Sequence, residues 1–325
     1  MLFLTKLHLE NYCGYVHHTF DFKKPDGNPH QFVCFFGPNG VGKTAILGAI
    51  SLLTANQMGR DPNNVQRSLR KYVKNTDYDP HYERISGHAY KNDFAISYED
   101  SLPHMIIEGT YELDGKSYVV RLSQDGFERN DLAPTDNGGG PWGDDHLKYR
   151  QRVAHTLTAD SDLSMSKFQL VCSAIPIFEE ITSRIMRYPT SCTPPSGIVP
   201  MDQEYCTDFT LFKRGDKIHY KRMSAGEQKI TTAFSQLFNL MYDLANPDPG
   251  DEPMVNWPRL LLVDNIDLHI YYDRHIEMVE CMKKYFNHQQ IFATTHSGVL
   301  IPRFKAHQND QINEMYVDLE EVHEG

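Results

Sequence analysis

Long apolar runs and an excess of basic charge are both missing from this 325-residue sequence. No stretch approaches the roughly 20 apolar residues that a membrane-spanning helix requires. The opening Met1-Leu-Phe-Leu-Thr-Lys6 turns polar too soon for a signal peptide. The formal net charge of −11 argues against a basic coat for nucleic acid, although it is compatible with a local basic groove. We expect a soluble protein with no membrane contact, and DNA binding is left open.

Cysteine motifs and metal-type histidine spacing are also missing. The six cysteines contain no CxxC pair, which argues against disulfides or a zinc site and fits a reducing cytoplasmic compartment. The sequence shows no cluster of carboxylates or histidines of the kind that forms a nuclease active site, so we do not expect this chain to be a nuclease. Five histidines lack the spacing of zinc ligands, and we expect them at the surface or near a bound nucleotide: His17, His18, His269, His275 and His288.

Apolar patterning predicts alternating strands and helices at both ends of the chain. Leu2–Glu10 alternates as a half-buried strand does, and Gln31–Phe36 is a short apolar run that ends in glycine. Thr44–Ala55 has a helical apolar face. Downstream we predict a hairpin at Phe209–Tyr220, a helix from Ser224 to Leu244, a strand at Arg259–Val263, a helix at Ile276–Phe286 and a strand at Gln290–Thr294.

The pattern is weaker between Asn56 and Asp208. Met105–Leu122 predicts a hairpin that turns at Asp114-Gly115, and Phe168–Arg187 predicts a helix. Sustained heptads are missing, which excludes a long coiled-coil arm. We therefore expect one α/β domain over residues 1–325, with an inserted lobe at 56–208.

The segment Gly37-Pro-Asn-Gly-Val-Gly-Lys-Thr44 matches the phosphate-binding pattern GxxxxGK[ST] at every fixed position. It lies between a predicted strand and a predicted helix, which is the context that this motif requires. Its glycines let backbone N–H groups approach phosphate oxygens, and the helix directs its positive end at the same anion. Lys43 supplies a charge to the phosphates, and the Thr44 hydroxyl is placed to bind Mg²⁺. The expected nucleotide contacts are Gly37, Asn39, Gly40, Gly42, Lys43 and Thr44.

Three downstream segments accompany this loop. Arg259–Asp264 is a buried strand that carries an aspartate to the carboxyl end of the sheet, where Asp264 can hold Mg²⁺ opposite Thr44. Met223-Ser-Ala-Gly-Glu-Gln228 opens a helix, and Ser224 with Glu227 also fits a simple capping box. Thr294-Thr-His296-Ser297 follows the last core strand, beside the expected nucleotide crevice.

Together these four segments resemble ABC ATPases, and more narrowly the branch of RecF and the SMC heads. Leu7-His-Leu-Glu-Asn-Tyr12 is similar to the opening strand of that branch. The Asp264–His269 and TTHS segments look most like short AAA-type ABC proteins of overcoming-lysogenization-defect and other anti-phage systems. The resemblance covers about residues 1–60 and 209–300. It implies a P-loop NTPase fold with a mixed central sheet, an N-terminal antiparallel β lobe and an inserted middle lobe.

The resemblance also implies a mechanism with ATP and Mg²⁺. Two copies of the chain would sandwich two nucleotides, and Ser224, Gly226 and Glu227 of one copy would complete the site of the other. His296 would sense the γ-phosphate, and Gln169 is the candidate for the family's glutamine-loop residue.

One position departs from the family pattern. In the family, the strand of Arg259–Asp264 corresponds to the Walker B motif, and the residue after its aspartate is usually a glutamate that acts as general base. This chain has Asn265 at that position. An amide cannot accept a proton, so we expect slow hydrolysis. Asp267 could substitute as the base if its loop turned it toward the phosphate, but a role in the dimer-contacting loop is the simpler interpretation.

Three functions follow as hypotheses. The first is an ATP-driven regulatory or motor subunit that dimerises on ATP and controls a separate effector, a nuclease by our expectation, in DNA maintenance or anti-phage defence. The second is a slowly hydrolysing, ATP-bound scaffold or sensor. The third is a transporter ATPase subunit, which the N-terminal strand and the lack of membrane segments disfavour.

Overall fold

The computed structural model describes most of the chain's two ends and part of its middle. The described residues are 2–55, 106–113, 115–123, 126–131, 154–158, 168–193, 205–242, 259–267, 270–302 and 314–324.

An antiparallel sheet contains the N-terminus. Its order is β2-β1-β4-β5-β6. The strands are β1 (Leu2–Tyr12), β2 (Tyr15–Asp21), β4 (Ile106–Leu113), β5 (Lys116–Ser123) and β6 (Gly126–Asp131). Cys13 and Gly14 join β1 to β2 with positive φ angles of 50° and 101°. A two-residue turn with two positive φ angles matches the right-handed twist of the strands that it joins.

A second, five-stranded sheet forms the centre of the molecule, with the order β15-β3-β14-β13-β7 and parallel pairing throughout its described strands. The strands are β3 (Phe32–Phe36), β7 (Ala154–Thr158), β13 (Arg259–Asp264), β14 (Gln289–Thr295) and β15 (Glu314–Asp318). All of β3 and β14 is buried. Strands of a parallel sheet are covered on both faces, which explains why their sequences are continuous apolar runs.

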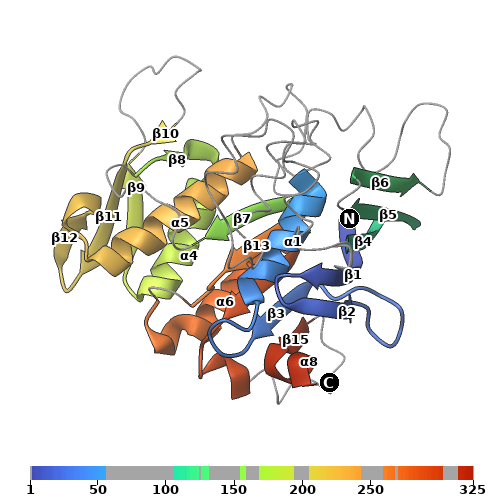
Figure 1. Cartoon of the computed structure of the whole chain (residues 1–325). Coiled ribbons are helices and arrows are strands. Elements are labelled where there is room, and N and C mark those ends of the chain that lie inside the picture. Colours follow the sequence, from blue (N-terminus) through green and yellow to red (C-terminus); the bar gives the residue numbers. More distant parts are fainter. Residues whose placement is uncertain are drawn as a thin grey trace, which may run out of the picture.

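Helix α1 (Lys43–Ala55) covers one face of the parallel sheet and lies between the two sheets (Figure 1). Side chains alternate between the faces of a strand, so Val33 and Phe35 of β3 point to this layer. They share a core with the buried leucines of β1 and with Ile46 and Ile50 of α1. The loop Gly37–Thr44 therefore leads into a helix that is packed between the two sheets.

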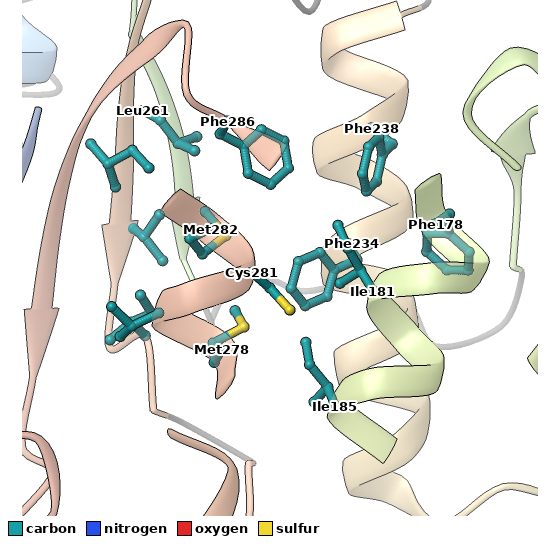
Figure 2. Packing of buried hydrophobic residues seen from close by; sticks show 14 of the residues in the cluster. Phe178, Ile181, Ile185, Phe234, Phe238, Leu261, Met278, Cys281, Met282 and Phe286 are labelled. Atoms are coloured by element: carbon teal, nitrogen blue, oxygen red, sulfur yellow. The ribbon is translucent and has the colours of Figure 1, made fainter. Parts of the chain in front are cut away.

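Three helices cover the other face: α4 (Ile175–Met186), α5 (Ala225–Tyr242) and α6 (His275–Tyr285). Figure 2 shows their contact, in which Phe234 of α5 and Ile185 of α4 lie toward Cys281 and Met278 of α6. Smaller elements border this layer. They are η5 (Cys172–Ala174), η6 (Tyr220–Arg222), η8 (Tyr272–Arg274), the β8–β10 pair (Leu170–Val171, Tyr205–Cys206) and a three-stranded sheet of β9 (Thr190–Thr193), β11 (Asp208–Lys213) and β12 (Asp216–His219). The short helix α8 (Leu319–Glu324) packs instead in the layer of α1, through Leu319 and Val322.

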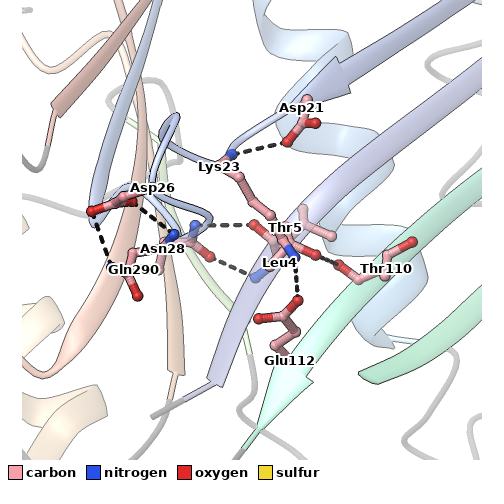
Figure 3. Close-up of polar contacts among 9 residues, drawn as sticks. All are labelled: Leu4, Thr5, Asp21, Lys23, Asp26, Asn28, Thr110, Glu112 and Gln290. Atoms are coloured by element: carbon pink, nitrogen blue, oxygen red, sulfur yellow. Dashed lines mark hydrogen bonds and ion pairs between the residues drawn. The ribbon is translucent and has the colours of Figure 1, made fainter. Parts of the chain in front are cut away.

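The side chain of Gln290 fastens the two sheets together. Its Oε1 accepts a bond from the Leu4 N–H at 2.7 Å, and its Nε2 donates to the carbonyls of Leu4 and His30 at 3.0 and 2.9 Å. Gln290 is fully buried on β14, and Leu4 lies on β1. Figure 3 shows this contact beside the Thr5–Thr110 bond between β1 and β4.

The predicted elements at both ends are confirmed, with boundaries shifted by a few residues. The mixed α/β fold is confirmed too, with the antiparallel and parallel strands in separate sheets. The helix predicted at Phe168–Arg187 is shorter, because β8 and η5 occupy its first part. Asp114, His269 and Leu244 lie outside the described residues. The inserted lobe at 56–208 stays a prediction, although β4 to β7 of that region belong to the two main sheets.

None of the six cysteines, all of which the structure describes, forms a disulfide. Among the described residues, no helix is long and apolar enough to cross a membrane.

We predict that Gln290→Leu lowers the free energy of unfolding by about 2–5 kcal/mol. The substitution leaves the N–H of Leu4 and two carbonyls without their buried partner, and each such loss costs about 1–3 kcal/mol. Urea unfolding followed by circular dichroism measures the change. Gln31→Leu is the control, because Gln31 is only half-buried and its side chain bonds one carbonyl, that of Asn287. An equal loss in both variants would contradict the proposed fastening role.

Candidate functional site

The loop Gly37–Thr44 joins the end of β3 to the start of α1 and has the backbone that its sequence predicts. Gly40 and Gly42 have φ angles of 84° and 96°, which disfavour any residue with a Cβ. A Cβ on Gly42 would lie 2.8 Å from the Tyr15 hydroxyl oxygen. Gly37 also has a positive φ, and Asn39 is exposed near the tip of the loop. The predicted loop residues therefore surround one concave turn at a helix N-terminus.

The Lys43 side chain is directed back onto this loop. Its Nζ donates to the carbonyls of Gly37 and Pro38 at 2.7 and 2.8 Å, and the residue is only 5% exposed. Burial lowers the pKa of Lys43, and the carboxylates of Asp264 and Asp267 oppose that change. The ammonium group is thus held where an anion on the loop would meet it.

Thr44 and Asp264 form the second part of the site. The Thr44 hydroxyl lies 3.2 and 3.1 Å from the two carboxylate oxygens of Asp264. These residues are 220 positions apart, and the fold brings them together at the carboxyl edge of the parallel sheet. A hydroxyl and a carboxylate are hard oxygen ligands, which suit Mg²⁺. The donor set therefore fits the metal that the sequence predicts.

Thr294 begins the Thr294–Ser297 segment and positions Asp264, a role that its sequence context does not predict. Its hydroxyl donates to Asp264 Oδ1 at 2.6 Å and accepts the Asn265 N–H at 2.7 Å. The strand register could have predicted this role of Thr294. Val263 of β13 pairs with Ala293 of β14, so the residues that follow them, Asp264 and Thr294, lie side by side. That signal exists only once β13 and β14 are known to be neighbours.

Asn265 follows Asp264 in a left-handed backbone conformation with a φ of 52°. Asparagine tolerates this conformation better than most residues, because its short polar side chain can bond locally. The Ile266 N–H donates to the Thr294 carbonyl at 2.9 Å, so the turn after β13 is held on β14. The structure thus adds a backbone reason for asparagine at this position.

Asp267 and His296 meet at the end of β14. The Asp267 Oδ1 accepts bonds from the Thr295 hydroxyl at 2.7 Å and from the His296 N–H at 3.3 Å. These bonds tie Asp267 to the end of β14, and its role as a base or as part of a dimer-contacting loop stays a prediction. His296 is exposed beside the sheet edge that carries Asp264, as the prediction of a phosphate sensor requires.

His275 differs from the surface histidine that its spacing suggests. It is buried, and its ring lies 2.7 Å from the Ser297 hydroxyl through Nδ1 and 2.8 Å from the Ile270 carbonyl through Nε2. The ring therefore joins α6 to the segment after His296. His288, by contrast, is exposed as expected.

The segment Ser224–Gln228 forms the start of α5 and a complete capping box. The Ser224 N–H and hydroxyl donate to Glu227 Oε2 at 2.9 and 2.7 Å, and the Glu227 N–H lies 3.4 Å from the Ser224 oxygen. Lys213 lies 3.3 Å from the other Glu227 oxygen. Ser224, Gly226 and Glu227 line a cavity of about 430 Å³ beside Tyr271.

This segment lies apart from the phosphate loop of its own chain. α5 begins beside β12 at the left of Figure 1, whereas the loop lies near the centre between β3 and α1. One chain therefore does not bring Ser224 to its own Lys43.

Gln169 also lies outside the site at the sheet edge. It is exposed, precedes β8, and its carbonyl accepts a bond from the Asn239 amide at 2.9 Å. Its role as a glutamine-loop residue stays a prediction.

Tyr15 contacts the phosphate loop at Gly42, which the sequence does not predict. It follows the β1–β2 turn, is 2% exposed, and its hydroxyl lies 3.4 Å from the Gly42 carbonyl. Burial raises the pKa of this hydroxyl, so it stays protonated. The first hairpin thus supports the phosphate loop directly.

Known proteins resemble this chain in sequence and fold. Residues 6–164 match a family model described as an AAA domain. The chain is 27% identical over 108 residues to the retron Vc95 probable ATPase of Vibrio cholerae serotype O1 biovar El Tor. That match covers 33% of this chain but only 20% of the relative, so the chain matches about a fifth of that protein's length.

Solved SMC heads share the fold. The Pyrococcus furiosus Smc head bound to the C-terminal domain of ScpA aligns with a TM-score of 0.55 and 13% identity, over 93% of this chain and 92% of that one. An SmcHead bound to the C-winged helix domain of ScpA gives 0.55 and 15%, over 92% of each chain. The structural likeness establishes the fold. The AAA-domain match over residues 6–164 includes the phosphate-binding loop Gly37–Thr44.

We predict that Thr294→Val weakens Mg²⁺-dependent ATP binding about 10-fold, because loss of a residue that orients a metal ligand typically weakens binding 10–100-fold. Titration with a fluorescent ATP analogue, with Mg²⁺ and with a chelator, measures the effect. Thr295→Val is the matched control, since its hydroxyl bonds Asp267 instead of Asp264. Equal weakening in both variants would show that Thr294 does not act through Asp264.

Proposed function

We propose that this chain is an ATP-dependent regulatory or motor subunit that dimerises on ATP and controls a separate effector, a nuclease, in DNA maintenance or anti-phage defence. The contact between Thr44 and Asp264, beside a glycine loop that encloses the Lys43 ammonium, is the observation that carries the proposal. A site with this geometry suits a nucleoside triphosphate with Mg²⁺ better than any other ligand class.

The loop residues would bind the phosphates. The loop ends at the N-terminus of α1, where the first N–H groups of a helix lack partners within it and the helix dipole favours an anion. Lys43 would exchange its bonds to the Gly37 and Pro38 carbonyls for bonds to phosphate oxygens. Thr44 and Asp264 would hold the Mg²⁺, which neutralises charge on the β- and γ-phosphates when it is bound.

A second copy of the chain would complete the site. The separation between the start of α5 and the phosphate loop supports an arrangement in which Ser224 and Gly226 contact the nucleotide of a partner molecule. The Ser224 hydroxyl and the N–H groups at the start of α5 are suitable donors to a γ-phosphate. His296, exposed at the end of β14, would contact the same phosphate.

Hydrolysis at this site would be slow. The Asn265 amide can orient a water molecule but cannot accept its proton, and general-base assistance contributes typically 10²–10⁴-fold in rate. The hydrogen bonds of Asp267 to the end of β14 leave it a weak substitute. Slow turnover would favour a long-lived dimer, which suits a regulatory subunit.

The relation to defence rests on one relative. The chain shares 27% identity over 108 residues with a protein described as a retron probable ATPase. Control of an effector, a nuclease in our proposal, follows from the family resemblance and from the lack of a nuclease-type cluster in the sequence. The finer placement among overcoming-lysogenization-defect-type ATPases belongs to the same proposal, as do a cytoplasmic location and any contact with DNA.

A nucleotide-bound scaffold or sensor is the second candidate, and Asn265 is the observation that favours it. Turnover separates the two functions. Vigorous hydrolysis by the native chain would exclude the scaffold, whereas turnover too slow to cycle the dimer would favour it. A transporter subunit has less support, because the fold matches SMC heads.

We predict that Asn265→Glu hydrolyses ATP at least 10-fold faster than the native chain, since it restores a general base. Asn265→Gln is the matched control, because it has the length of glutamate without the carboxylate. Both variants strain the left-handed backbone by about 1–2 kcal/mol, so thermal unfolding should show equal losses. Steady-state phosphate release measures turnover. If the glutamate variant is no faster than the glutamine variant, Asn265 does not limit hydrolysis.

We also predict that Mg²⁺-ATP converts the native chain from monomer to dimer, as measured by sedimentation velocity. Ser224→Arg should retain ATP binding but lose the dimer, because the long side chain would occupy the phosphate position of the partner site. Ser224→Thr keeps the hydroxyl and should dimerise normally. Lys43→Ala should lose both ATP binding and the dimer. A dimer of Ser224→Arg as stable as the native one would exclude the trans contact.

A further inference from the structure

Three potential metal ligands come together on the outer face of the β1–β2 hairpin. In the ladder, His8 lies opposite Thr19 and Glu10 lies opposite His17. Residues two apart on a strand share a face, and directly opposite residues do too. The buried Leu7 and Leu9 point to the core, which leaves His8 and Glu10 on the solvent side.

The ligand atoms of this group are close enough to bind one ion. One ligand atom each from His8, Glu10 and His17 lies within 4.8 Å of the others. The His8 Nε2 is 3.7 Å from a Glu10 oxygen, and the rings of His8 and His17 meet edge to face. Ligands bound to one tetrahedral ion at about 2.0–2.1 Å lie roughly 3.3 Å apart, so small rotamer changes suffice.

A second contact orients His8. Its Nδ1 lies 2.8 Å from the Thr19 hydroxyl oxygen. In the metal-binding tautomer this nitrogen donates its hydrogen to Thr19, and Nε2 keeps its lone pair toward Glu10. Metal-binding histidines in proteins usually have such a partner on the second ring nitrogen.

The backbone under the group is fixed. His8 and Glu10 project from β1, which pairs with β2 on one side and β4 on the other, and His17 projects from the edge strand β2. All three ligands therefore stand on paired strands and not on a loop. Glu108 of β4 lies opposite His8 and adds negative charge nearby. The strands therefore hold the ligand positions before any ion binds.

From this arrangement we propose that His8, Glu10 and His17 form a zinc site with a fourth position open to water or to a partner's ligand. Two imidazoles and one carboxylate suit Zn²⁺ and related transition metals, whereas Mg²⁺ prefers oxygen ligands alone. The group differs in this respect from Thr44 and Asp264, whose ligands are both oxygens. The spacing of His17 along the sequence does not predict such a site, because the three ligands are adjacent across strands and not along the chain.

Titration of the full chain with Zn²⁺, in excess Mg²⁺ and monitored by calorimetry, tests the site. We expect one Zn²⁺ per chain, with affinity reduced at least 10-fold in His8→Ala and in His17→Ala. Thr19→Val should weaken binding without abolishing it, through loss of the orienting bond. His288→Ala, which removes another exposed histidine, should bind as the native chain does.

Co²⁺ identifies the ligands independently. Visible bands of a four- or five-coordinate Co²⁺ that disappear in His8→Ala support the site, with thermal unfolding of the metal-free variants as the check on folding. A thiolate charge-transfer band would place the ion on a cysteine and overturn the assignment. Native protein that binds no Zn²⁺, or variants at His8 and His17 that bind it unchanged, would overturn it too.

Discussion

The carboxylate of Asp264 is the group on which the candidate site depends. It accepts hydrogen bonds from Thr44, at the start of α1, and from Thr294, at the end of β14. Thr294 in turn holds the backbone of Asn265. A single carboxylate therefore joins the start of α1 to the end of β14 and, through Thr294, to the turn after β13. These contacts require β13 and β14 to be parallel neighbours, and the apolar sequences of both strands suit the interior of such a sheet.

The packing around the site explains why the loop can keep its shape. α1 is enclosed by apolar side chains of both sheets, and Gln290 fixes the sheets to each other through two buried hydrogen bonds to the backbone of Leu4. Buried polar contacts of this kind are specific in direction, whereas apolar contacts are not. The core thus brings the layers together, and Gln290 fixes the position of β1 relative to β14.

Much of this arrangement could be predicted from the sequence, and the remainder depends on contacts between strands. The phosphate loop, β13, β14 and the start of α5 have local patterns that determine their structure. The role of Thr294 depends on strand adjacency, and the group formed by His8 and His17 depends on antiparallel register, neither of which spacing along the chain reports. Asn265 is the instructive case. Its chemistry was evident from the sequence, but its left-handed backbone was not.

Tyr15 connects the β1–β2 hairpin to the phosphate loop, and this contact could transmit the effect of a ligand from one to the other. The residue packs on Gly42, and His17 lies two positions along the same strand. A ligand on the outer face of the hairpin and a nucleotide on the loop would therefore lie at two ends of the contact between Tyr15 and Gly42. Thermodynamic linkage is reciprocal, so whatever factor one ligand applies to the affinity of the other is returned unchanged. Any coupling between ligands on the hairpin and on the loop would pass through the Tyr15–Gly42 contact.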